Sequence, residues 1–160
     1  MLLRLKEDYD GAEPAASSIS VLNLLTLAHL VDDEDARAKA ERTLGRYGDR
    51  AGRAARVIPM MLAALSSYHA GLSQIVVLGA RDAARPLLAE VGRHYLPFAV
   101  TIPAEPGAPQ QALAPMLPFV AAMRPADGAA ATAFVCRDFT CREPVSTREA
   151  LAGQIASPRA

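Results

Sequence analysis

The sequence predicts a mainly α-helical protein with a smaller α/β part in its C-terminal half. Two observations carry this prediction. Up to residue 72, apolar residues recur with helical spacing in three long segments. From Gln74 onwards the pattern changes to short β-branched runs, separated by turn residues and by one helical stretch. We therefore expect helical hairpins over residues 1–72 and a small segment containing a β-α-β unit within residues 73–160.

Length and composition limit the classes of function. The chain has 160 residues, of which 51% are apolar, and its formal net charge is zero. This length is enough to bury a core. Neutral charge argues against nucleic acid as the main partner, because phosphate binding needs a basic surplus. The first eight residues have no apolar core typical of a signal peptide, and no apolar run reaches the ~18 residues of a membrane span. We expect a soluble, cytoplasmic protein that does not bind a membrane.

Three helices are expected in the first half. Residues 14–31 are apolar on nearly every side, which indicates a buried helix with Pro14 in its first turn. The acids of 32–35 break this pattern and favour the start of a second helix. Residues 58–71 again read as a buried helix, ended by Gly71. The second helix has only a narrow apolar stripe and should lie on the surface; the stripe is Ala36, Ala40, Leu44 and Tyr47.

The second half alternates strands and helices. Strands are expected at 75–78, 98–102 and 131–135, because these runs are apolar and rich in β-branched residues. A helix capped by Asp82 should separate the first two strands, and a connection of this kind favours a parallel pair. Its expected apolar stripe is Leu88, Val91 and Tyr95.

Shorter elements follow the second strand. Residues 103–109 are rich in turn residues, and 116–123 could form a short helix interrupted by Pro118. Ser146 should cap a final helix over 147–155, with Glu149 completing a capping box.

The first candidate site is an acidic segment near the N-terminus. Acidic side chains are dense here, and carboxylates beside a cavity can bind polyols or transfer protons. Alternatively, the segment is a solvated loop with compensating basic residues. The catalytic candidates are Glu7, Asp8, Asp10 and Glu13, and the ligand-binding candidates are Lys6 and Tyr9.

The second candidate is the pair Cys136 and Cys141. It could supply half of a zinc site or a reversible thiol pair, or it could be two small packed residues. No second ligand pair accompanies it in the sequence, so we expect free thiols in the protein purified under reducing conditions, no bound metal and no cofactor.

Two motifs give the chain a family resemblance. Lys6–Pro14, read KEDYDGAEP, and Cys136–Val145, read CRDFTCREPV, resemble the C-terminal end of the thioredoxin-domain-containing proteins of the YyaL and spermatogenesis-associated type. The resemblance covers nearly the whole chain. Members of that family have a thioredoxin-like domain followed by an (α/α)6 toroid similar to N-acylglucosamine 2-epimerases and six-hairpin glycosidases.

The resemblance implies a place within that architecture. Residues 1–72 would be the terminal helices of a partial (α/α)6 toroid, and 73–160 a small C-terminal α/β segment. The implied function is carbohydrate-related binding or processing, with an incomplete site on this chain. The alternative is a non-catalytic interaction module or a thiol-redox-linked module, so whether the chain is an enzyme stays open. Its two apolar helices should lead it to self-associate or to bind the toroid and thioredoxin-like parts that it lacks.

Overall fold

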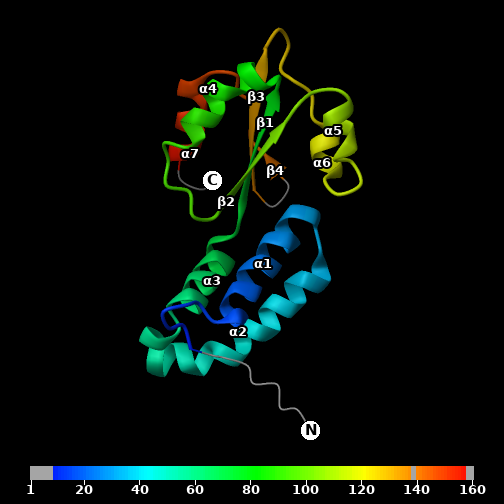
Figure 1. Ribbon diagram of the computed structural model, residues 1–160. Helices are drawn as coiled ribbons and strands as arrows, with labels where there is room; N and C mark the ends of the chain where they lie inside the picture. The colour runs from blue at the N-terminus through cyan, green and yellow to red at the C-terminus, as the bar shows by residue number, and fades with distance from the viewer. Residues whose placement is uncertain (1–8, 138–139, 158–160) are drawn as a thin grey trace. The chain divides into compact units, whose positions relative to one another are not determined.

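A computed structural model describes residues 9–137 and 140–157 of the chain (Figure 1). The chain divides into two compact units, Met1–Gly71 and Leu72–Ala160. The first is helical and the second combines helices with a sheet, which confirms a mainly α-helical protein with a small α/β part. No helix in the described ranges is long and apolar enough to cross a membrane.

Residues 9–71 of the first unit form three α-helices and one 3₁₀ turn. Helix α1 covers Ala16–Val31, α2 covers Glu34–Ala54, the 3₁₀ turn η1 covers Ala55–Val57 and α3 covers Pro59–Ala70. Helix α1 packs against both α2 and α3. The expected stripe of α2 is confirmed, because Ala36, Ala40 and Leu44 are buried while the remaining faces are largely charged.

Local sequence explains where these helices begin and end. The side chain of Asp33 caps α2 by accepting hydrogen bonds from the N–H groups of Asp35 and Ala36, both at 3.0 Å. Gly71 ends α3 with a φ of 69°, a conformation that glycine adopts without steric cost. Pro14 lies outside α1, which begins two residues later than expected, at Ala16.

Two tyrosine hydroxyls join the helices of the first unit. Tyr47 on α2 and Ser17 on α1 share a hydrogen bond of 2.9 Å between their hydroxyl oxygens. The Tyr68 hydroxyl on α3 donates to Glu41 Oε1 on α2 at 3.1 Å. The first bond links α1 to α2, and the second links α2 to α3.

The second unit is built on a four-stranded sheet in the order β2-β1-β3-β4. Strand β1 covers Ser73–Gly79, β2 covers Ala99–Ala104, β3 covers Ala131–Arg137 and β4 covers Thr140–Cys141. Strands β1 and β2 are parallel, as expected, whereas β3 runs antiparallel to β1. The edge strand β2 contains Pro103, whose side chain is exposed.

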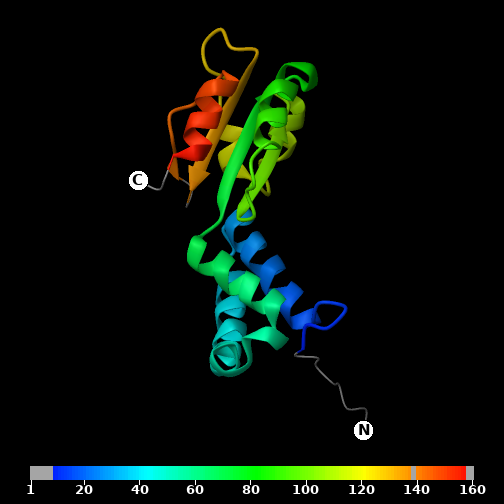
Figure 2. The ribbon, with the colours of Figure 1, turned by 90° about the vertical axis from the view of Figure 1, so that its left-hand side faces the viewer.

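Helices cover both faces of this sheet. Helix α4, Arg81–Val91, and helix α7, Arg148–Ala156, lie on one face, while α5, Ala108–Ala112, and α6, Pro118–Ala122, lie on the other (Figures 1 and 2). The core beneath α4 and α7 is aliphatic; its buried members are Ile75, Val77, Ala84, Leu87, Val91, Ala131, Ala133 and Leu151.

Several local expectations in this unit are wrong in detail. Asp82 does not cap α4, whose N-cap residue is Ala80. Tyr95 lies beyond that helix and is 90% exposed, so it is not part of the apolar stripe. Thr147, rather than Ser146, caps α7, and Glu149 is then one position too early for a capping box. The short helix α5, Ala108–Ala112, begins within the expected loop of 103–109, and neither α5 nor β4 was expected from the sequence.

An irregular edge connects β4 to α7. Val135 O accepts the N–H of Arg142, and Ala133 exchanges both backbone hydrogen bonds with Val145. Between these two pairings β3 advances by two residues, whereas the opposite segment advances by three. The partner strand uses one more residue than β3 over this stretch, which is the signature of a β-bulge. Pro144 lies within the bulge, where a missing N–H removes no ladder bond.

Candidate functional site

The structure describes part of the acidic segment. Lys6, Glu7 and Asp8 lie outside the described residues, so their predicted roles stay predictions. Tyr9 is 57% exposed, and Glu13 is also exposed. Asp10, in contrast, is a buried residue with 7% exposure. The segment is therefore not uniformly solvated, and its described acids have different environments.

Asp10 holds the starts of two helices together. Its Oδ1 accepts the N–H of Ala15 at 2.8 Å, and its Oδ2 accepts the N–H groups of Met60 and Met61 at 2.9 and 3.1 Å. The first helical turn leaves N–H groups without intrahelical partners, so one carboxylate satisfies donors at the starts of both α1 and α3. The backbone N–H of Asp10 also donates to Val57 O at 2.9 Å.

These contacts set the ionisation of Asp10. Burial alone would raise the pKa of this carboxyl group, but the hydrogen bonds from Ala15, the Ser18 hydroxyl, Met61 and Met60 outweigh it and hold the pKa below its ordinary value. A carboxylate held ionised by several donors is poorly suited to proton transfer near neutral pH. The geometry gives Asp10 a structural role as a shared helix cap, and its catalytic role stays a prediction.

Tyr9 and Glu13 remain accessible on the same loop. The Tyr9 ring lies over Gly11, where a Cβ atom would come within 2.9 Å of the ring. The N–H of Gly11 donates to Glu13 O at 3.1 Å, within a bend of the backbone over residues 11–13. The loop thus presents one aromatic ring and one carboxylate, carried on the backbone that Asp10 anchors.

The cysteine pair differs from expectation. Cys136 and Cys141 face each other across β3 and β4 and are joined by a disulfide, which was not expected from the sequence. Free thiols under reducing conditions stay a prediction. Their direct opposition on antiparallel strands brings the side chains within bonding reach. Cys136 is 1% exposed, whereas Cys141 is exposed. The bond therefore has one shielded and one accessible end.

Neither cysteine sulfur is a thiolate in this form, so neither is available as a zinc ligand. Among residues 9–137 and 140–157, no three His, Cys, Asp or Glu side chains gather in the manner of a metal site. The weak metal candidates Cys136 and Cys141 therefore receive no support from the oxidised geometry.

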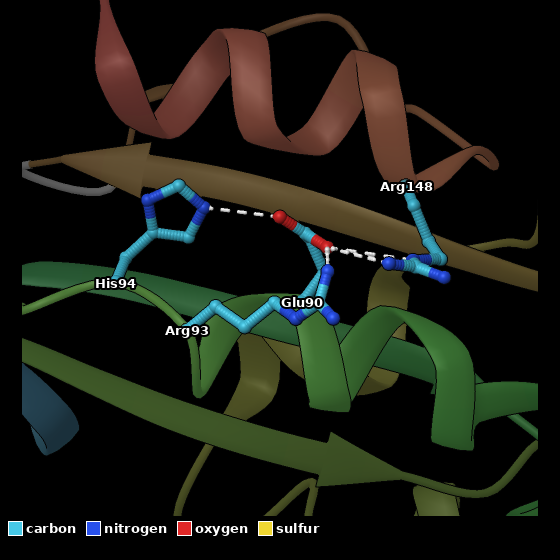
Figure 3. A network of polar contacts seen from close by, with 4 residues as sticks. All are labelled: Glu90, Arg93, His94 and Arg148. Atoms are coloured by element: carbon cyan, nitrogen blue, oxygen red, sulfur yellow. Dashed lines mark hydrogen bonds and ion pairs between the residues drawn. The ribbon is translucent and has the colours of Figure 1, made fainter.

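Sequence reasoning missed a polar network between α4 and α7. The carboxylate of Glu90, on α4, contacts three basic side chains (Figure 3). Its Oε1 lies 3.2 Å from His94 Nε2, and its Oε2 lies 3.3 Å from Arg148 Nη2, 3.4 Å from Arg148 Nε and 3.7 Å from Arg93 Nη1. Arg148 is the first residue of α7, so the carboxylate joins the two helices that share one face of the sheet.

Glu90 is a buried residue with 8% exposure, which makes its partners important. Burial would raise the pKa of its carboxyl group, but the contacts with His94, Arg148 and Arg93 lower the pKa below its usual value. The spacing of Glu90 and His94 was a usable helical signal. Arg148 is 58 residues from Glu90 in sequence, and no local pattern connects them.

Nearly the whole chain is similar to one segment of several longer proteins. It is 38% identical to human spermatogenesis-associated protein 20 over 146 residues, and 37% identical to the rat protein of the same name over 147 residues; both matches cover 90% of this chain and 18% of the relative. An uncharacterized protein of Caenorhabditis elegans is 30% identical over 150 residues, 93% of this chain and 20% of the relative.

The chain is homologous to one segment of these longer proteins. This homology agrees with the resemblance carried by the two sequence motifs. Because the chain spans about a fifth of the length of these curated relatives, activities of the whole proteins are not transferred to it. No family model matches the chain, and no solved structure matches it. The toroid and the thioredoxin-like domain stay predictions.

Proposed function

We propose that this chain acts as a thiol-redox-linked, non-catalytic interaction module, in which the Cys136–Cys141 bond is made and broken reversibly. The observation that carries the proposal is the cross-strand disulfide with one buried and one exposed end. A disulfide is reduced by thiolate attack on an accessible sulfur, and Cys141 Sγ is the sulfur of the more exposed residue.

The exchange needs a dithiol reductant. One thiolate of the dithiol attacks Cys141 Sγ and forms a mixed disulfide, while Cys136 Sγ leaves with the bonding electron pair and takes up a proton. The second thiol of the reductant then attacks the reductant sulfur that is bonded to Cys141 Sγ, and Cys141 is released as a thiol. Overall, two electrons and two protons pass to the cysteine pair and the reductant becomes a disulfide.

The redox state would be transmitted to α7. Strand β4 has two residues, and so short a strand is held weakly by its ladder bonds alone. Directly after it, Arg142 Nη1 donates to Gln154 O at 3.0 Å, and Gln154 Nε2 donates to Glu143 O at 2.7 Å. These reciprocal bonds clamp the end of β4 to the last turns of α7. Release of β4 from β3 would loosen the clamp and the packing of α7.

Hydrogen exchange on the whole chain tests this function. We expect amides of 148–156 to exchange faster after reduction with dithiothreitol, and thiol titration to find two thiols per chain. The Cys141→Ser variant should exchange at the rate of the reduced protein with or without reductant, which controls for direct effects of the reagent. Unchanged exchange in α7 after complete reduction would refute the coupling. The disulfide could also be incubated in glutathione buffers poised at about −250 mV. If it stays fully oxidised there, reversibility in a reducing compartment is refuted.

A carbohydrate-related role is a second proposal, favoured by one observation. Tyr9 and Glu13 place an exposed aromatic ring and a carboxylate on an anchored loop, and such a surface offers apolar contact and hydrogen-bond acceptors to a sugar. Titration with N-acetylglucosamine, followed by NMR, would test it. Binding should weaken in Tyr9→Ala and in Glu13→Gln, whereas equal shifts in wild type and both variants, or no shifts, would refute it.

A further inference from the structure

A cavity of about 270 Å³, open to solvent on one side, lies in the second unit near the start of α7. Its walls come from three places in the fold: one side of α4, residues 129–131 at the start of β3, and residues 146 and 148 at the start of α7. The lining consists of small or aliphatic side chains and two polar ones; it includes Ala83, Pro86, Leu87, Ala130, Ser146 and Arg148. A volume of this size suits a ligand of a few non-hydrogen atoms, below the usual range for drug-sized ligands.

Arg148 gives the cavity its chemical character. A guanidinium group has five N–H donors in a planar fork, and Glu90 engages Nε and Nη2. The third nitrogen points away from Glu90 (Figure 3). The Arg148 side chain is 46% exposed, so a ligand in the cavity can reach these remaining donors. Planar donors of this kind match the two oxygens of a carboxylate.

Arg148 is the one charged residue among those that line the cavity. The single carboxylate of Glu90 is shared between the guanidinium groups of Arg93 and Arg148 and the imidazole of His94. The positive charge of Arg148 favours an anion, and the alanine, proline and leucine walls favour a short alkyl group attached to it.

We propose that this cavity binds a small monocarboxylate, with its carboxylate on the Arg148 guanidinium and the Ser146 hydroxyl, and its alkyl chain against Ala83 and Leu87. This site uses neither the disulfide nor the acidic segment, so it stands independently of the function proposed above. The ligand is held by a side chain that the structure has already fixed through Glu90, which reduces the ordering that binding requires.

Butyrate is a suitable probe, and butyramide is its neutral counterpart. In NMR titrations of the full chain, we expect butyrate to shift the amides of 129–131 and 146–148, with a dissociation constant of about 1 to 10 mM for so small a ligand. Butyramide should bind at least about tenfold more weakly, because it lacks the charge that the guanidinium recognises.

Three variants separate the site from its surroundings. Arg148→Gln should weaken butyrate binding at least about tenfold, since it removes the recognising group. The Arg93 side chain contacts the same carboxylate but does not line the cavity. The Arg93→Gln variant should therefore weaken butyrate binding much less. Ala83→Leu fills the cavity without touching the Glu90 contacts, and it should abolish binding even if Arg148→Gln proves too unstable to measure.

The proposal fails if butyrate causes no shifts at the stated amides, if butyramide binds as well as butyrate, or if Ala83→Leu binds butyrate like the wild type. It also fails if the folded Arg148→Gln variant retains wild-type affinity.

Discussion

The carboxylate of Asp10 accepts the backbone N–H of Met60, fifty residues away in sequence, at 2.9 Å. Through this contact a residue before α1 fixes the start of α3, and the same carboxylate also serves the N–H of Ala15. The acidic segment is thereby built into the first unit at one position, while Tyr9 and Glu13 remain exposed on either side.

Asp10 should therefore matter for stability. We expect Asp10→Ala to lower the free energy of unfolding by about 2 to 3 kcal/mol, because several N–H donors at two helix starts lose a charged acceptor. Urea unfolding followed by the helical circular dichroism signal would measure it. Glu13→Gln is the matched control and should change stability by no more than about 0.5 kcal/mol. Equal midpoints for both variants would contradict the capping role.

The same residue predicts a dependence on pH. Its pKa is lower in the folded state than in the unfolded chain, so its contribution is present above the unfolded value of about 3.9 and is lost as pH falls through the folded pKa. We expect the difference in stability between wild type and Asp10→Ala to be constant near neutral pH and to shrink below about pH 4. Urea midpoints at a series of pH values would test this. A difference that stays constant to pH 2 would argue against an ionised Asp10 in the native state.

Glu90 should couple α4 to α7. Glu90→Gln removes the charge that three basic side chains share, and we expect it to lower the unfolding midpoint of the second unit. A double-mutant cycle locates the effect: Glu90→Gln with Arg148→Gln should be strongly non-additive, whereas Glu90→Gln with Arg93→Gln should be nearly additive. The Arg93 side chain is 68% exposed, and exposed ion pairs contribute little. Additivity in both cycles would show that the network does not join the helices.

We also propose that the isolated chain self-associates through α1. Ile19, Leu27 and Val31 recur near helical spacing and are each at least 37% exposed, so α1 presents an apolar stripe on its exposed side. Light scattering should show a mass that rises with concentration, and Leu27→Glu should reduce it. Thr43→Glu, on α2, is a control that adds the same charge elsewhere. A wild-type monomer at all concentrations, with no binding of a hydrophobic dye, would rule this out.

Local sequence accounts for much of this fold because many of its determinants are local. The stripe of α2, its Asp33 cap and the glycine that ends α3 all lie within a few residues of the structure they specify. The site was less predictable. Asp10 looked like its neighbours Glu13 and Tyr9 in a polar run, and its burial depends on N–H groups at Met60 and Met61.

The second unit shows the same difference between features set by local sequence and features set by distant residues. The parallel pairing of β1 and β2 follows from a short strand-helix-strand pattern, whereas the Cys136–Cys141 bond depends on a two-residue strand too short to recognise by periodicity. Thr147 caps α7, although the adjacent Ser146 has a similar capping ability, so the residue type alone could not decide between them.

The edge strand β2 has a consequence for solubility at high concentration. The N–H of Ser73 donates to Phe98 O, so the alternation along the strand turns the backbone groups of Ala99, Thr101 and Pro103 outward. Proline has no backbone N–H group, so Pro103 presents no donor at this edge. An incoming strand from another molecule would find an interrupted row of donors at this edge, which makes β2 a poor template for cross-β aggregation.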